Sequence, residues 1–171
     1  MPRVRMIERR EDTAPNQVEI FDHIAASRGG EMIRPFAAML HRPDIARATA
    51  DLGAVIRYQS TLSDHDREVV ICTTAVERDC GFEWESHSPL ARSAGVSDAT
   101  LTSIASGEAV EHAEDTVLVD FVRELCREGR VSDPTYRAAQ SRFGEAGTVE
   151  LAAIIGYYTM LALFMNAVEA C

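Results

Sequence analysis

The chain has 171 residues, which is enough for one domain with a sizeable core and short for two. Its 17 basic side chains are all arginine, which excludes Schiff-base chemistry, a pyridoxal-phosphate enzyme and a P-loop, because each of these needs a lysine. The formal net charge of −10 argues against nucleic acid as a partner, because phosphate binding needs a basic surface. Small solutes or other proteins are the expected partners.

The first 14 residues differ in character from the rest of the chain. Residues 1–14 are too charged to pack alone, and we predict a tail or an arm that lies on a neighbouring subunit. Residues 15–171 are predicted to form a single domain.

Helical spacing of apolar residues recurs along this domain, and proline, serine or aspartate opens many of the segments. No strand-like alternation appears, so the predicted fold class is all-α, with about eight or nine helices including short ones. The first expected segments are a helix from Pro15 that Gly29 and Gly30 end, a short turn over 35–40, and a helix over 44–59. Three helices follow, from Ser63 to the turn at Asp79, from Cys80 to near Gly95, and from Ser97 to Gly107. The last three helices are expected over 114–128, from Ser132 to Phe143, and from after Gly147 to Val168.

One of these segments, residues 44–59, is amphipathic. The residues that lie close to helical spacing are Ile45, Ala48, Leu52, Val55, Ile56 and Gln59. We therefore expect this face to enter the core.

The last segment is almost wholly apolar from Leu151 to Val168, long enough to raise the question of a membrane span. Tyr157, Thr159 and Asn166 lie within it, and no Lys or Arg flanks it, so a membrane partner is not expected. A helix that is apolar on all sides can instead lie centrally in a bundle or at a subunit interface. Exposure of such a helix favours self-association, and we expect a homotrimer or homohexamer.

Four cysteines occur without paired spacing, which is typical neither of a disulfide framework nor of a zinc site: Cys72, Cys80, Cys126 and Cys171. This usage suits a reducing compartment, and no apolar stretch near Met1 could serve as a secretory signal. A cytoplasmic location is therefore expected.

A thiol, a carboxylate, an indole and an imidazole share one face of the helix expected from Cys80. Cys80, Glu83, Trp84 and His87 fall at i, i+3, i+4 and i+7. These side chains could form an acid/base site, or Trp84 could simply pack while Glu83 and His87 pair as neighbours. A metal pair of Glu83 and His87 lacks a third ligand at a suggestive offset, so neither a metal nor another cofactor is expected.

Glu68 is a further candidate, either as a member of a proton relay or as an acid that complements its helix dipole. On one straight helix Glu68 and Cys80 would lie about 18 Å apart. They can therefore meet only if the chain bends back or if another subunit supplies one of them. The other four histidines are expected to be surface or capping groups: His23, His41, His65 and His112.

The order Glu68, Cys80 twelve positions on and His87 seven further, followed by Ala91 and Gly95, resembles the carboxymuconolactone decarboxylase and alkylhydroperoxidase-D-like superfamily. The likeness covers roughly Phe36 to the C-terminus and implies that superfamily's helical bundle. In its peroxidase branch the pattern is Glu, Cys-x-x-Cys and His, and the second cysteine attacks the peroxide.

In this chain Glu83 stands at the position of the attacking cysteine. The run from Cys80 to Trp84 instead looks like a branch often labelled decarboxylase-like. The resemblance implies cofactor-free decarboxylation, or related acid/base chemistry, on a small carboxylated lactone or oxo-acid. His87, Glu68, Cys80 and Glu83 are then the candidate catalytic residues, and Trp84, Arg57, Arg78 and Tyr157 are the candidate substrate-binding residues.

Two alternatives remain open at this point. One is a thiol peroxidase that uses Cys80 alone, with an external thiol or Cys72 resolving it. The other is a non-catalytic oligomeric binding protein that keeps the fold and lacks the chemistry.

Overall fold

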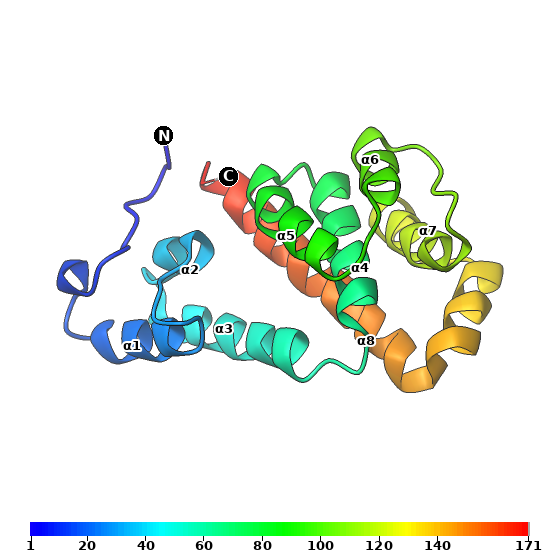
Figure 1. Cartoon of the computed structure of the whole chain (residues 1–171). Coiled ribbons are helices and arrows are strands. Elements are labelled where there is room, and N and C mark those ends of the chain that lie inside the picture. Colours follow the sequence, from blue (N-terminus) through cyan, green and yellow to red (C-terminus); the bar gives the residue numbers. More distant parts are fainter. Residues whose placement is uncertain (171) are drawn as a thin grey trace. The chain divides into compact units, whose positions relative to one another are not determined.

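The computed structural model describes residues 1–170, and over this range it consists of eight α-helices and one short 3-10 turn, without a strand (Figure 1). The predicted all-α fold class is confirmed. The described residues form two compact units, which we call unit 1 (residues 1–60 and 164–170) and unit 2 (residues 61–163). The assignment of residues 15–171 to a single domain stays a prediction.

Unit 1 has a small apolar core formed by its first elements. These elements are the 3-10 turn η1 (Arg10–Asp12) and the helices α1 (Val18–Ala26), α2 (Arg34–Met39) and α3 (Pro43–Tyr58). Phe21 and Ala25 of α1 pack with Leu40, which directly follows α2. The side-chain amide of Gln17 donates to the Leu40 carbonyl at 2.9 Å and so joins the start of α1 to the end of α2.

The charged N-terminal segment is anchored to unit 1 by one apolar side chain. Ile7 is only 3% exposed and belongs to the same core, and its N–H donates to the Ala37 carbonyl at 3.0 Å. Its charged neighbours pair along the surface, as Arg10 does with Asp22. Placement of residues 1–14 on a neighbouring subunit stays a prediction.

The prediction of the core face of α3 is wrong except at Ile56, which is 4% exposed. Ile45, Leu52 and Val55 are between 47% and 48% exposed. The buried face carries mostly smaller side chains instead: Ala46, Thr49, Ala50, Gly53 and Ile56. Small residues allow α1 and α2 to pack closely against α3, so close packing decided which face is buried.

Unit 2 is organised around α4. Its helices are α4 (Asp64–Glu77), α5 (Gly81–Ser93), α6 (Asp98–Ser106), α7 (Ala113–Glu128) and most of α8 (Asp133–Ala167). α4 packs against α5, α6 and α7 (Figure 1). Every residue from Glu68 to Ala75 is consequently buried, so a polar side chain in this stretch must find a partner inside the protein.

A tight reversal joins α4 to α5 and positions the candidate site. Ser63 caps α4 as predicted, accepting the Asp66 N–H at 3.1 Å. At the other end the Cys80 N–H donates to the Ala75 carbonyl at 2.9 Å, while Asp79 adopts a left-handed conformation with φ of 49°. The chain therefore bends back within unit 2, and α5 returns along α4.

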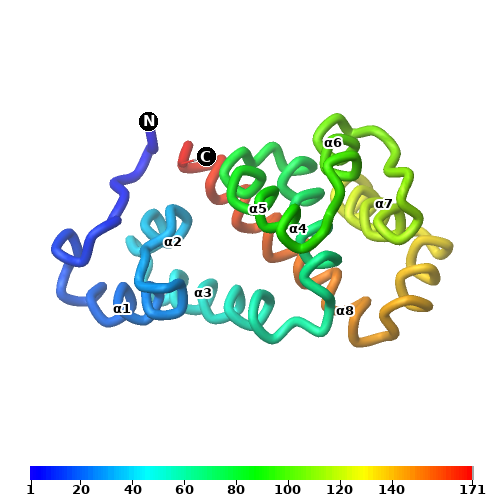
Figure 2. Tube along the Cα trace, viewed as in Figure 1, coloured from blue at the N-terminus to red at the C-terminus, as the bar shows by residue number. Residues whose placement is uncertain are grey.

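α8 is kinked at Gly144, where φ is 67° and ψ is −172° (Figure 2). The predicted break after Gly147 is therefore wrong by a few residues. Gly147 is helical, and a Cβ there would lie 2.6 Å from the Phe143 Cβ, so glycine is needed for close packing rather than for a turn.

By length and composition α8 could cross a membrane. Half of its most apolar 18-residue window is buried inside the described structure, a property shared by the core helices of globular proteins. The expectation that no membrane is involved stays a prediction.

Candidate active site

A buried histidine lies between two carboxylates in unit 2. His87 Nδ1 is 2.7 Å from Glu68 Oε2, and His87 Nε2 is 3.6 Å from Glu83 Oε2. Each of the three side chains is at most 5% exposed. The structure thus brings together three of the four predicted catalytic residues, although their catalytic role stays a prediction.

This arrangement follows from the faces of two helices. Glu83 and His87 are one turn apart on α5, so they share a face, and that face is buried. Glu68 comes from the fully buried stretch of α4, nineteen positions earlier than His87. Burial of ionisable groups is costly unless they are paired, and here each carboxylate faces the imidazole. We name His87, Glu68 and Glu83 the histidine–carboxylate cluster.

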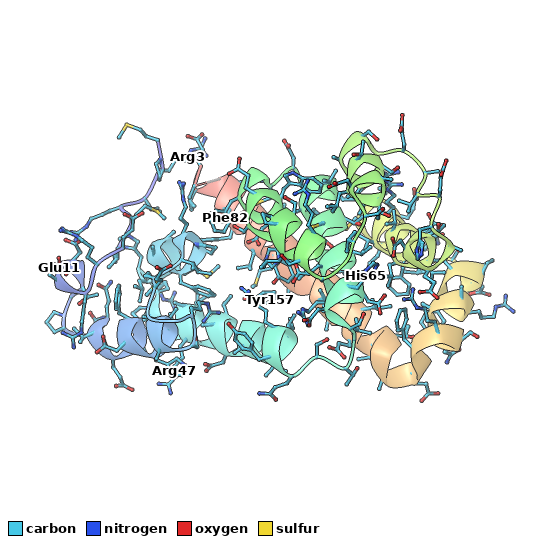
Figure 3. The ribbon with its side chains drawn as sticks, viewed as in Figure 1. Arg3, Glu11, Arg47, His65, Phe82 and Tyr157 are labelled. Carbon is cyan, nitrogen blue, oxygen red and sulfur yellow. The ribbon has the colours of Figure 1, made fainter. Side chains whose placement is uncertain are left out.

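Aromatic rings of α8 extend this cluster. The Tyr158 ring meets the His87 ring edge-on, with centroids 5.2 Å apart and planes at 85°. Tyr157, the predicted substrate contact, is labelled in Figure 3. It is 5% exposed and packs edge-on against Tyr158. Sequence reasoning missed Tyr158, because an almost wholly apolar helix gives no periodic signal that shows which tyrosine faces His87.

Cys80 and Trp84 meet at a separate cavity of about 260 Å³. Ala75, Val76, Asp79, Cys80, Gly81, Trp84 and Ala105 line it. Cys80 is the N-cap residue of α5, where the helix dipole favours a thiolate, and it is 2% exposed. The predicted thiol and indole are therefore adjacent to one small cavity.

The other described cysteines, Cys72 and Cys126, are free thiols. Burial raises the pKa of Cys72 to about 12, and the nearby charge of Glu68 acts in the same direction. Burial also raises the pKa of Cys126. A thiol must ionise to attack another sulfur, so Cys72 is poorly suited to resolve an oxidised Cys80. Cys171 lies outside the described residues.

The two arginines predicted to bind a substrate carboxylate have other contacts. Arg78, at the end of α4, donates to Thr159 Oγ1 at 3.3 Å and to the Cys126 carbonyl at 2.9 Å. Arg57 belongs to α3 of unit 1, and its guanidinium lies 5.8 Å from the centre of the Tyr58 ring. Their roles as substrate ligands stay predictions.

Arg67 is the arginine that sequence reasoning missed. Its Nε lies 3.8 Å from Glu68 Oε1, and its side chain is 11% exposed. Its position directly before Glu68 was the only sign in the sequence that the two side chains could interact. Consecutive side chains on a helix normally diverge, so this sign did not predict the contact.

A second buried acid, Asp115 of α7, is held by polar groups from α4 and α6. Asp115 is 2% exposed. Its Oδ2 accepts from Thr100 Oγ1 at 2.9 Å, and its Oδ1 lies 2.8 Å from Nε2 of His65, a residue labelled in Figure 3. His112 Nδ1 lies 3.4 Å from the Asp115 carboxylate. His65 was expected to be a surface or capping group; it is instead half-buried and links α4 to α7 through Asp115.

Within residues 1–170, no group of three or more His, Cys, Asp or Glu side chains is arranged to hold a metal ion. The expected absence of a metal and of any other cofactor stays a prediction.

Comparison with known proteins gives one positive result. No curated protein matches the chain. The model of the carboxymuconolactone decarboxylase family matches residues 43–119, a range that runs from the start of α3 into α7 and includes Glu68, Cys80, Glu83 and His87. Residues 43–119 are therefore similar to the carboxymuconolactone decarboxylase family.

Proposed function

We propose that the protein is a cofactor-free decarboxylase, or a related acid/base enzyme, that acts on a small carboxylated lactone or oxo-acid. One observation carries this proposal: the His87 imidazole is buried between Glu68 and Glu83. The name of the matched family supports the reaction class.

Decarboxylation of such a substrate needs little from the enzyme. When the bond to the carboxylate carbon breaks, CO2 leaves and the electron pair moves into a conjugated carbonyl, giving an enolate. A proton then adds to carbon, so the net change is R–CO2⁻ plus H⁺ giving R–H plus CO2. The protein must bind the carboxylate, stabilise the enolate oxygen and deliver the proton.

His87 is suited to the proton transfer. With Glu68 ionised, Nδ1 carries a proton and donates it in a hydrogen bond to Oε2, which fixes the orientation of the ring. Nε2 is then the nitrogen that exchanges a proton with the reacting carbon or enolate, on the side of Glu83.

We assign the remaining roles to residues predicted from the sequence. Arg57 or Arg78 binds the substrate carboxylate. Tyr157 provides an apolar wall next to Tyr158 and His87, and Trp84 provides one at the cavity beside Cys80. A water-excluding site strengthens a hydrogen bond to the developing enolate.

Release of CO2 from carboxymuconolactone and from a set of small 3-oxo acids tests the proposed reaction. The wild-type protein is expected to accelerate release from at least one of these probes in metal-free buffer containing a chelator. No acceleration with any probe would contradict the decarboxylase assignment.

A thiol peroxidase that uses Cys80 is the second candidate, and the cavity beside Cys80 favours it. We expect dithiol-linked peroxide turnover to be negligible, because Glu83 occupies the position of the attacking cysteine. Rapid peroxide consumption that Cys80→Ser abolishes would favour this candidate over the decarboxylase. Absence of both activities would favour the non-catalytic binding protein.

We also propose that the protein assembles as a homotrimer or homohexamer in a reducing cytoplasm. One face of α8 is apolar and exposed along its length: Val149, Ala152, Ala153, Gly156, Met160 and Leu163. Val149 and Leu163 are 69% and 57% exposed, which is unusual for large apolar side chains. A second copy of the same helix could cover this face, since small residues allow helices to approach closely.

A further inference from the structure

The histidine–carboxylate cluster carries an excess of negative charge when both acids are ionised. Glu68 and Glu83 both contact His87, and a protonated imidazole balances only one of them. Charges buried this deeply are only weakly screened by solvent, so a nearby cation interacts strongly with them.

Arg67 supplies such a cation through an unusual geometry. Neighbouring side chains on α4 diverge, yet the Arg67 side chain runs back along the helix and donates from Nη2 to Asp64 Oδ1 at 2.8 Å. This path brings its Nε to 3.8 Å from Glu68 Oε1. The guanidinium therefore lies between an exposed acid and a buried acid.

The Nε group itself is buried and has no hydrogen-bond partner in the part of the chain that the structure describes. A buried N–H without a partner is costly and is uncommon in folded proteins. Its position beside Glu68 gives this N–H an electrostatic role, because the carboxylate is within range of the positive charge.

We propose that Arg67 is the positioning residue of the Glu68–His87 pair. Its charge faces Oε1 and orients the Glu68 carboxylate, so that Oε2 accepts from His87 Nδ1 and Nε2 is left for proton exchange. This inference rests on the proposed function for its kinetic consequences, but its structural part concerns only these three side chains.

Arg67→Gln and Arg67→Lys test the proposal, with Arg137→Gln as a matched control. Arg137 also lies one turn from an acid on its own helix, Asp133, but its side chain is 73% exposed. Far-UV circular dichroism of each variant establishes that the fold is retained before any other comparison is made.

The first readout needs no substrate. In protein labelled with ¹⁵N-histidine, the His87 resonances, assigned from a His87→Gln spectrum, report which ring nitrogen carries the proton. We expect a protonated Nδ1 in the wild type, Arg67→Lys and Arg137→Gln, and loss of this signal in Arg67→Gln. Unchanged His87 nitrogen shifts in a folded Arg67→Gln variant would overturn the proposal.

The second readout separates positioning from substrate binding. With a probe that the wild type decarboxylates, kcat of Arg67→Gln should fall roughly tenfold to a hundredfold with little change in KM, and Arg67→Lys should recover most of the loss. A higher KM with unchanged kcat would make Arg67 a substrate ligand and overturn the positioning role. If the wild type decarboxylates no probe, the proposed function fails, and the nitrogen shifts still decide the role of Arg67.

Discussion

Cys72 lies one turn after Glu68 on α4, in surroundings that suppress ionisation of its thiol. With a pKa of about 12, only about one thiol in ten thousand is ionised at pH 8. We expect iodoacetamide at pH 8 to modify Cys72 only after the protein is unfolded in urea, as followed by peptide mass spectrometry. Equal labelling rates in folded and unfolded protein would contradict the burial of this thiol.

The same shift links Cys72 to stability at high pH. Because its pKa is higher in the folded than in the unfolded protein, the free energy of unfolding should decrease as the pH rises from about 8.5 towards 12. Cys72→Ala should remove this part of the pH dependence, while lowering the free energy of unfolding near neutral pH through the lost packing.

The backbone conformation of Asp79 has a measurable cost in stability. It ends α4 with a positive φ, a conformation in which glycine is unstrained, and its side chain is exposed. Asp79→Gly should therefore raise the free energy of unfolding by about 0.5 kcal/mol, after the entropy cost of glycine is included.

Urea denaturation measures this effect, with Asp120→Gly as the control. Asp120 is an exposed residue inside α7, where glycine should lower the free energy of unfolding by about 1 kcal/mol. Destabilisation by Asp79→Gly of the same size as the control would show that its conformation is not strained.

At the scale of elements, Asp115 holds the start of α4 to α6 and α7. Asp115→Ala leaves the half-buried His65 and the buried Thr100 without their shared acceptor, and we expect the free energy of unfolding to fall by about 2–3 kcal/mol. Asp120→Ala, on the same helix but exposed, should change it by no more than about 0.5 kcal/mol. Similar midpoints in urea for the two variants would contradict this role.

Helices with local signals could be predicted from the sequence. Ser63 and Ser97 cap α4 and α6 as expected, and Gly107 ends α6 in a left-handed conformation. The kink in α8 could not be located, because Gly144 and Gly147 are equally plausible breaks until packing shows that Gly147 lies against Phe143. Local signals fix where a helix begins, whereas tertiary packing decides which of its faces is buried.

In the candidate site, too, local contacts could be predicted from the sequence and contacts between helices could not. The pairing of Glu83 with His87 follows from helical spacing, but the contact between Glu68 and His87 joins two helices and was expected only from the family resemblance. Neither helical spacing nor the family resemblance indicated the contacts of Arg67 and Tyr158. Their contacts depend on how a long side chain bends and how α8 is rotated, neither of which periodicity encodes.

At the scale of the whole molecule, the exposed apolar face of α8 predicts self-association. Light scattering at micromolar concentration should give the mass of a trimer or hexamer for the wild type. Leu163→Glu, which places a charge on this face, should shift the protein to smaller species, whereas Arg137→Gln should not. A stable wild-type monomer would contradict the proposed assembly.

The central claim is that His87 transfers a proton in a decarboxylation, and the steady-state kinetics of His87→Gln test it most directly. His23→Gln is the matched control, because His23 also contacts a carboxylate, Asp51 at 2.6 Å, but is partly exposed on α1. With a probe that the wild type decarboxylates, we predict that His87→Gln lowers kcat by about a hundredfold or more with the fold intact, and that His23→Gln leaves kcat unchanged. A folded His87→Gln protein that releases CO2 at the wild-type rate would contradict the claim.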